Sequence, residues 1–254
     1  ADQTVSVSTT DDDVAGFTVA ETEGSTGVDE SGTTDTITVV LNAQPTSDVV
    51  IAISSSDISE SSVNSPLTFT SANWDTPQTV TVTGVDDDII DGDQGTTITI
   101  SVVDALSDDD FDALNDQTVA AITTDNDQAG FTVVEFGGST GVAESGTTDT
   151  FTVVLDAQPD SNVVITLTSD DTGEATVTST LTFTPANWDT AQTATVTGVD
   201  DNTIDGSQTS TITIAVDDAN SDNNFDAVAD KTVSVVTTDD DNAGFTIVQT
   251  QGST

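Results

Sequence analysis

Carboxylates are almost the only side chains of this chain that could do chemistry, and they gather in short stretches. The sequence DDDIIDGD covers residues 86–93 and DND covers residues 125–127, while single glutamates stand earlier at Glu30 and Glu60. Carboxylates held a few ångströms apart raise one another's pKa and oppose folding, and a divalent cation reverses that effect. The pattern therefore predicts binding of a hard metal ion.

Calcium is the metal that fits these donors. Calcium takes six to eight oxygen ligands at roughly 2.3–2.6 Å and tolerates irregular geometry. Magnesium requires a stricter octahedron, and zinc prefers the nitrogen and sulfur donors of histidine and cysteine. The chain contains neither residue. We expect several Ca²⁺ ions to be bound.

The charge balance argues against other classes of function. The chain has 46 acidic residues against one basic residue, Lys231, and a formal net charge of −45. Nucleic-acid binding needs Lys and Arg to neutralise phosphates, so no nucleic-acid partner is expected. No run reaches the roughly 20 apolar residues of a membrane span, so no membrane insertion is expected. Catalysis by paired carboxylates is conceivable, but solvated or metal-bound carboxylates are favoured, and we expect no enzyme.

A repeat of 114 residues organises the chain. Residues 14–127 and 128–241 align without a gap and are identical at 75 of 114 positions. Residues 1–13 match the end of each repeat, and residues 242–254 match the beginning of repeat 2. We therefore expect two complete repeats, the last strand of a truncated preceding repeat at 1–13, and the first strand of a truncated following repeat at 242–254. The chain reads as an excerpt of a longer tandem array.

Alternating Thr and Val, Ile or Leu predicts short half-buried strands separated by turn residues. Seven strands are expected in each repeat. In repeat 1, six of them lie at 36–41, 49–54, 67–70, 79–84, 97–102 and 117–122. The seventh opens each repeat and is clearest in repeat 2, at 129–133. This number of strands in about 110 residues is typical of an antiparallel β-sandwich. The predicted class is all-β, with tandem antiparallel Greek-key sandwiches of the Ig-like kind.

These strands would position the carboxylates at one end of each sandwich. The acidic stretch at 86–93 follows the strand 79–84, and Asp125 follows the strand 117–122. If the two strands run the same way, both groups emerge together. Because strand side chains alternate, Asp125 and Asp127 should point to one side. Trp74 and Trp188 recur at one repeat position, which favours packing over ligand binding.

The segments GVDDDIIDGDQ and DNDQAGFTVV, with the opening GVDESGTTDTITVVL, resemble the acidic stretches and first half of Calx-beta domains. The resemblance covers each whole repeat and implies a seven-stranded sandwich with clustered Ca²⁺ at the tip. In repeat 1 it implies as ligands Glu30, Asp86, Asp87, Asp91, Asp125 and Asp127, the backbone carbonyl of Ile89 and, as a looser match, Glu60. In repeat 2 it implies Glu144, Glu174, Asp200, Asp201, Thr203 through its backbone, Asp205, Asp239, Asp240 and Asp241.

Departures from that pattern bear on the number of ions. Gln94 and Gln208 stand where Calx-beta domains have an acidic ligand, so one clustered ion is expected to be weakened or lost. Ser207 replaces Asp93 between the repeats, which argues against an essential ligand there. Asn126 replaces an aspartate found in both other joints, so its joint should hold cations less tightly.

The near-identical tandem and the lack of cysteine also resemble the extender regions of large RTX-type bacterial surface adhesins. That resemblance implies a Ca²⁺-rigidified, extracellular stalk at the cell surface and a role in cell adhesion and biofilms. Its partners would be neighbouring repeats of the same polypeptide, in a monomeric array with end-to-end contacts through the terminal strands. Two alternatives remain: repeats that bind a glycan or ice, and intracellular Ca²⁺ sensing.

Overall fold

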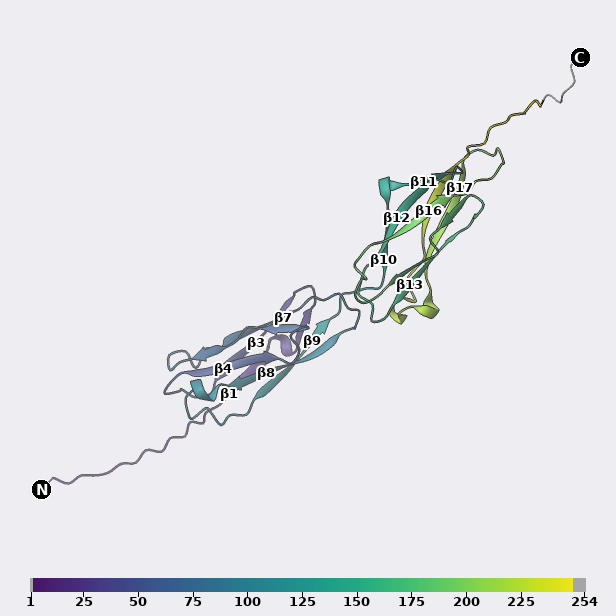
Figure 1. Ribbon diagram of the computed structural model, residues 1–254. Coiled ribbons are helices and arrows are strands. Elements are labelled where there is room, and N and C mark those ends of the chain that lie inside the picture. The colour runs from purple at the N-terminus through teal and green to yellow at the C-terminus, as the bar shows by residue number, and fades with distance from the viewer. Residues whose placement is uncertain (1, 249–254) are drawn as a thin grey trace, which may run out of the picture. The chain divides into compact units, whose positions relative to one another are not determined.

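A computed structural model describes residues 2–248 of the chain and divides them into two units. The first unit contains residues 2–87 and 91–126, and the second contains residues 88–90 and 127–248. Each unit has two β-sheets facing each other across a hydrophobic core of its own (Figure 1). The fold is all-β, which confirms the predicted class.

Within the described residues, the first unit has nine strands and two short 3₁₀ helices. They are β1 (Phe17–Glu21), η1 (Thr22–Gly24), β2 (Thr26–Asp29), β3 (Thr34–Leu41), β4 (Val49–Ser55), β5 (Ser61–Val63), β6 (Leu67–Phe69), β7 (Gln78–Gly84), β8 (Gln94–Val102), η2 (Asp104–Leu106) and β9 (Gln117–Thr124). One sheet has the order β1-β3-β7-β5 and the other β2-β9-β8-β4-β6.

The second unit repeats this order strand for strand. Its elements are β10 (Phe131–Glu135), η3 (Phe136–Gly138), β11 (Thr140–Ala143), β12 (Thr148–Leu155), β13 (Val163–Ser169), β14 (Ala175–Val177), β15 (Thr180–Phe183), β16 (Gln192–Gly198), β17 (Gln208–Val216), η4 (Asp218–Asn220), η5 (Asn223–Phe225) and β18 (Lys231–Thr238). Its sheets have the orders β10-β12-β16-β14 and β11-β18-β17-β13-β15.

Side-chain alternation builds both cores. In β3 the apolar residues Ile37, Val39 and Leu41 are buried, while Thr38 and Val40, which lie between them, are half-buried on the other face of the strand. Phe69 and Phe111 are fully or almost fully buried, and Trp74 packs against the same core from the loop before β7. The packing role expected for the tryptophans is confirmed at this position, and Trp188 packs in the same way in the second unit.

The strand count exceeds the expected seven because two strands, β2 and β5, are too short to show the alternation that reveals the others. β2 carries Gly27 at its second position, and β5 is only three residues long. β2 also pairs with β9 in parallel, so the sandwich is not wholly antiparallel. The same holds for β11 and β18.

The two terminal segments differ from the prediction of additional strands. Residues 2–16 and 239–248 form no strand in the described part of the chain, and residues 249–254 lie outside it. The matching strand β9 is held between β8 and β2. Residues 2–13 have no such neighbours here, and a strand without a ladder partner leaves its backbone groups to water.

Lys231, the one basic side chain, belongs to the fold. Its Nζ donates a hydrogen bond to the backbone oxygen of Phe131 and lies 5.1 Å from the centroid of the Phe131 ring. In the first unit, Gln117 stands at the same repeat position and its Nε2 donates to the Phe17 oxygen at 2.7 Å. Lysine and glutamine therefore make the same side-chain hydrogen bond to a backbone oxygen at this repeat position.

Candidate metal centre

Parallel pairing positions the first glutamate of each unit. Because β2 runs parallel to β9, both strands end at the same edge, and the backbone N–H of Glu30 donates to the Thr124 oxygen at 3.2 Å. Glu30 thus lies beside the segment that begins at Asp125. The second unit repeats the bond, from the N–H of Glu144 to the Thr238 oxygen at 3.1 Å.

A second strand pair brings the other glutamate to the same edge. Glu60 precedes β5, and the backbone N–H of Val85, the residue after β7, donates to the Glu60 backbone oxygen at 2.9 Å. Thr123 of β9 donates its hydroxyl to the same oxygen at 3.2 Å. Glu174 makes the matching bonds with Val199 at 2.8 Å and Thr237 at 3.3 Å.

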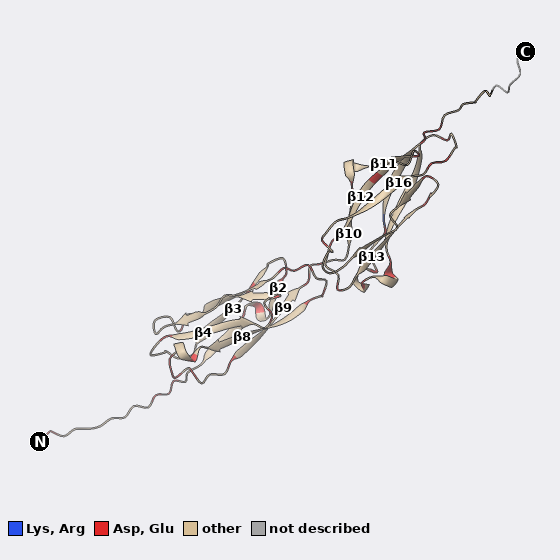
Figure 2. Cartoon of the chain, viewed as in Figure 1, with Lys and Arg blue, Asp and Glu red and all other residues tan. Residues whose placement is uncertain are grey.

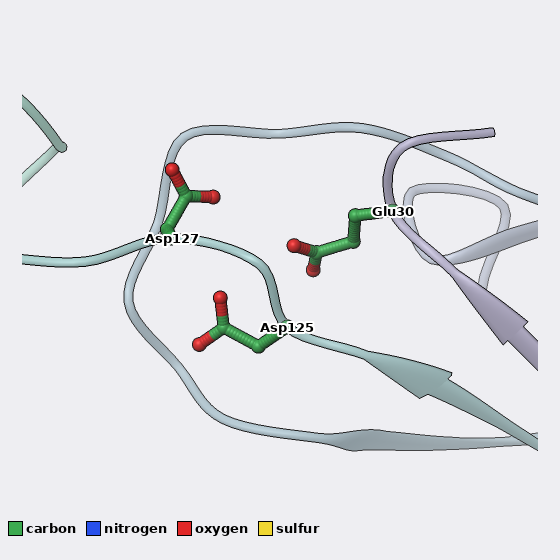
Figure 3. Close-up of side chains that lie close together, drawn as sticks. All are labelled: Glu30, Asp125 and Asp127. Atoms are coloured by element: carbon green, nitrogen blue, oxygen red, sulfur yellow. The ribbon is translucent and has the colours of Figure 1, made fainter.

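One carboxylate oxygen from each of Glu30, Asp125 and Asp127 lies within 4.8 Å of the others, close enough to share a cation. Figure 3 shows the Glu30 carboxylate directed toward the segment that carries the two aspartates. Along this segment Asp125 and Asp127 are half-buried while Asn126 is exposed. The alternation expected from the sequence therefore places the outer two residues of the triplet inward.

Among its described residues, the second unit contains two such groups, and they share one residue. Glu144, Glu174 and Asp205 form the first group, and Glu144, Asp201 and Asp241 form the second. All ligand atoms within a group lie within 4.8 Å of one another. Glu144 is only 1% exposed, so its carboxylate lies between the two groups away from solvent.

Burial and like charge raise the pKa of several of these carboxylates. For Glu144, desolvation is the largest effect and raises the pKa. A hydrogen bond from the Asp240 backbone lowers this pKa, and the nearby charges of Asp239 and Asp201 raise it further. For Glu174 the causes are desolvation and then the charge of Asp205. Removing protons from these groups is unfavourable unless a cation compensates.

Asp239 has a different environment from its neighbours. Its Oδ2 accepts a hydrogen bond from the Gly206 N–H at 2.8 Å, and its Oδ1 accepts one from the Asp241 N–H at 2.7 Å. These bonds lower the pKa of Asp239. In the first unit Asp125 accepts from the Gly92 N–H at 2.7 Å. In both units, then, this aspartate holds the acidic loop against the end of the last strand.

Several buried carboxylate oxygens accept no hydrogen bond from the protein. At the candidate site they are Glu60 Oε2, Glu144 Oε2, Glu174 Oε2 and Asp241 Oδ2, and Asp112 Oδ1 is a further one beside Asp104 and Asp109. A buried polar atom without a partner costs about 1–3 kcal/mol, and more when it carries charge. Four such oxygens at matching edges of two units indicate donors arranged for a ligand rather than for the protein itself.

The remaining predicted ligands lie at the margin of these groups. Five of them are exposed: Asp86, Asp91, Asp200, Thr203 and Asp240. Asp87 is half-buried. The charges of Asp91 and Asp87 help to raise the pKa of Glu60 after desolvation. The charges of Asp240 and Asp200 likewise help to raise the pKa of Asp241, after desolvation and the charge of Asp239. Ile89 belongs to the second unit, where it forms a bridge with Gln158.

Sequence reasoning missed two neighbours of the site. Asp57 and Asp171 stand three residues before Glu60 and Glu174, and each helps to raise the pKa of its glutamate. Their recurrence at one repeat position, across an otherwise variable loop, was the signal that could have found them.

Acidic residues, red in Figure 2, are distributed over both units.

The comparisons with known proteins support no further assignment. No family profile and no curated protein matches the chain. Its structure is similar to calcium binding domain CBD12 of CALX1.1, with 13% identity over 78% of this chain and 79% of that chain and a TM-score of 0.33. It is similar to domains 5-6 of the S-layer protein SbsC, with 19% identity, 90% and 100% coverage and a TM-score of 0.30. Such scores carry no argument, and the fold assignment depends on the strand order.

One further property concerns membranes. Among residues 2–248, no helix is long and apolar enough to cross a bilayer.

Proposed function

We propose that this chain is a Ca²⁺-binding structural segment whose carboxylate clusters hold cations that stabilise each sandwich. The observation that carries the proposal is Glu144, which is buried, has an oxygen with no protein partner, and belongs to two acidic groups at once. A single carboxylate in that position can contribute oxygens to two neighbouring ions.

The chemistry of the donors favours calcium. In the second unit the groups supply carboxylate oxygens, from Glu144, Glu174, Asp201, Asp205 and Asp241. The single lysine is committed to Phe131 in the fold and cannot neutralise them. A cation that binds the folded state and not the unfolded chain stabilises the fold by an amount that grows with its concentration relative to Kd. Millimolar extracellular calcium suits such a device.

A thermal melt tests the proposal at its central residue. The Tm of the unaltered chain should rise by many degrees with calcium, and less with magnesium, relative to chelator. Glu144→Gln should lose most of the calcium-dependent rise of the second unit. Asp160→Asn, at an exposed position outside the groups, removes the same charge and should keep the rise. Equal rises in the two variants would contradict the assignment of Glu144 as a ligand.

For the larger role, we propose an extender segment of a bacterial surface adhesin, extracellular and without enzymatic activity. The support is the similarity of the repeats, which are identical at 75 of 114 positions, because a spacer is multiplied while a binding domain is usually present once. Its partners would be neighbouring repeats, and neither nucleic acid nor a membrane interior suits its charge of −45.

Small-angle scattering tests the extender role. If calcium rigidifies the chain, its maximum dimension should be larger and better defined with calcium than with chelator. Folding controls by circular dichroism separate stiffening from folding. An unchanged dimension with and without calcium, in a chain that stays folded, would refute the stalk while leaving calcium binding intact.

A second candidate, binding of ice or a glycan, is favoured by one observation. On β3 and β7 three successive threonine pairs face each other in register: Thr34 with Thr83, Thr36 with Thr81 and Thr38 with Thr79. The same ladder recurs on β12 and β16. Sheet twist, roughly −20 to −25° per strand, works against a flat lattice match. Retention of the chain on ice, or on a glycan array, would establish this function in place of a spacer.

A further inference from the structure

A pocket of about 410 Å³ lies at the edge of the first unit, away from the acidic groups of that unit. Its apolar lining includes Ala15, Ala43, Phe111, Ala113 and Leu114, and its polar lining consists of Gln44 and the three carboxylates of Asp11, Asp13 and Asp110. Phe111 is part of the core, so the pocket opens directly onto packed apolar side chains.

In the second unit the same place is filled by the segment Asp88–Ile90. The Asp88 oxygen accepts a hydrogen bond from the Gln158 N–H at 2.7 Å, and Ile89 forms a parallel bridge with Gln158. The Ile90 oxygen accepts from Asn224 Nδ2 at 3.2 Å. The Ile90 side chain packs against the core of this unit.

The two places correspond residue by residue under the shift of 114. Gln44 corresponds to Gln158, and both glutamines are anchored by their Nε2, to the Ser71 oxygen at 2.7 Å and to the Pro185 oxygen at 3.1 Å. Phe111 corresponds to Phe225, which is fully buried in the second unit. The pocket of the first unit can therefore receive such a segment in the same way. The backbone N–H of Gln44 stands where the Gln158 N–H donates to Asp88, and the Phe111 side chain lies where Phe225 is buried.

We propose that this pocket receives residues 202–204 of a second copy of the chain. These residues stand at the repeat position of Asp88–Ile90, and the isoleucine is retained as Ile204. The Ile204 side chain is 57% exposed, whereas Ile90 is packed. The pocket belongs to the first unit and residues 202–204 belong to the second, so the contact between two copies is heterologous and builds open, head-to-tail chains of copies.

One substitution within the receptor weakens the contact. Asp110 stands where Asn224 donates to the Ile90 oxygen, and a carboxylate cannot make that bond. Asp110 is exposed and also adds negative charge opposite an acidic loop. Self-association should therefore be weak, and Asp110→Asn should strengthen it roughly threefold to tenfold, since it restores one donor and removes one charge.

Cross-linking tests the geometry of the contact. The chain has no cysteine, so Ala113→Cys in the pocket and Ile204→Cys can be joined by a short thiol-specific bifunctional reagent. The double variant should give a ladder of dimers, trimers and larger species, and each single variant at most a dimer. The matched control pairs Ala113→Cys with Ile58→Cys, at another isoleucine, 79% exposed. Equal ladders from both pairs, or none from either, would overturn the proposal.

Sedimentation velocity measures the strength of the same contact in solution. Weak, concentration-dependent association is expected; Ile204→Asp should weaken it at least about tenfold, while Ile58→Asp should leave it unchanged. Both experiments are run with calcium and with chelator, and association in either condition supports the contact, so the result does not depend on cation binding. A sedimentation coefficient that is independent of concentration for the Asp110→Asn variant would refute it.

Discussion

Asp108 shows how a carboxylate in this acidic chain can serve the fold without a cation. It is 4% exposed, and its Oδ2 accepts bonds from the Thr46 N–H at 2.7 Å, the Thr46 hydroxyl at 2.8 Å and the Ser47 N–H at 2.8 Å. Its Oδ1 accepts from the Asp110 N–H at 3.1 Å. These bonds lower the pKa of Asp108 to about 2. Asp222 holds the corresponding loop of the second unit.

We expect Asp108→Asn to lower the free energy of unfolding of the first unit by about 1–3 kcal/mol at neutral pH, because bonds to a charged acceptor are lost. A depressed pKa stabilises the fold above the ordinary value of 3.8, and this contribution disappears as the pH falls through about 2. The difference in Tm between variant and unaltered chain should therefore shrink below pH 3.8.

Thermal melts between pH 7 and pH 2 measure this difference. Asp109→Asn, at the exposed neighbouring position, is the matched control and should change Tm little throughout. A pH-independent difference for Asp108→Asn would show that its effect comes from shape rather than from charge.

At the scale of the elements, two glycines allow a strand end to reach the candidate site. A Cβ built on Gly198, the last residue of β16, would lie 2.1 Å from the Ala143 oxygen. Gly84 at the end of β7 meets the Asp29 oxygen at the same 2.1 Å. Ala143 directly precedes Glu144, so the close approach of β16 to β11 helps to place that glutamate.

Gly198→Ala should therefore destabilise the second unit by about 3 kcal/mol or more, the upper range for overpacking. It should also reduce the calcium-dependent rise in Tm, since the displaced backbone leads into Glu144. Gly141→Ala is the control, because its Cβ would lie 3.7 Å from the nearest atom and needs no displacement. Calorimetry with and without calcium measures both effects. A normal calcium response in a destabilised Gly198→Ala chain would separate the strand contact from the site.

How far the sequence predicts these elements depends on the kind of pairing. The alternation in residues such as Ile37, Val39 and Leu41 was enough to locate the long strands, because burial has a period of two. The strands β2 and β5 are only four and three residues long, too short for such a period to be recognised, and their pairing is set by tertiary contacts. The inward direction of Asp125 and Asp127 follows from alternation alone. The gathering of Glu174 with Asp205 depends on loop conformations that no local pattern encodes.

At the scale of the whole molecule, the charge of −45 makes pH and calcium act against each other. Without a cation, Glu144, Glu174 and Asp241 have raised pKa values in the folded state, chiefly through desolvation. A carboxylate whose pKa is raised in the folded state lowers the stability of the fold at pH values above that pKa. This destabilisation disappears as the pH falls toward 4.5, the ordinary value for glutamate. Calcium, by contrast, needs the deprotonated groups.

With chelator, Tm should therefore rise as the pH is lowered from 7 toward 5. Over the same interval, the additional rise that calcium produces should shrink, because protons compete with the ion for the same oxygens. Melts at a series of pH values, with and without calcium at constant ionic strength, measure both trends. A calcium increment that is as large at pH 5 as at pH 7 would argue against binding through these carboxylates.

The position of Lys231 has a consequence for proteolysis. Trypsin cleaves after lysine and arginine, so this chain of 254 residues offers it a single peptide bond, that between Lys231 and Thr232. Both residues are paired with β17, opposite Ile214 and Thr213, and the protease can act only when this part of the sheet opens. The rate of the single cut, followed on a gel, is thus a direct reading of how often β18 leaves its neighbour.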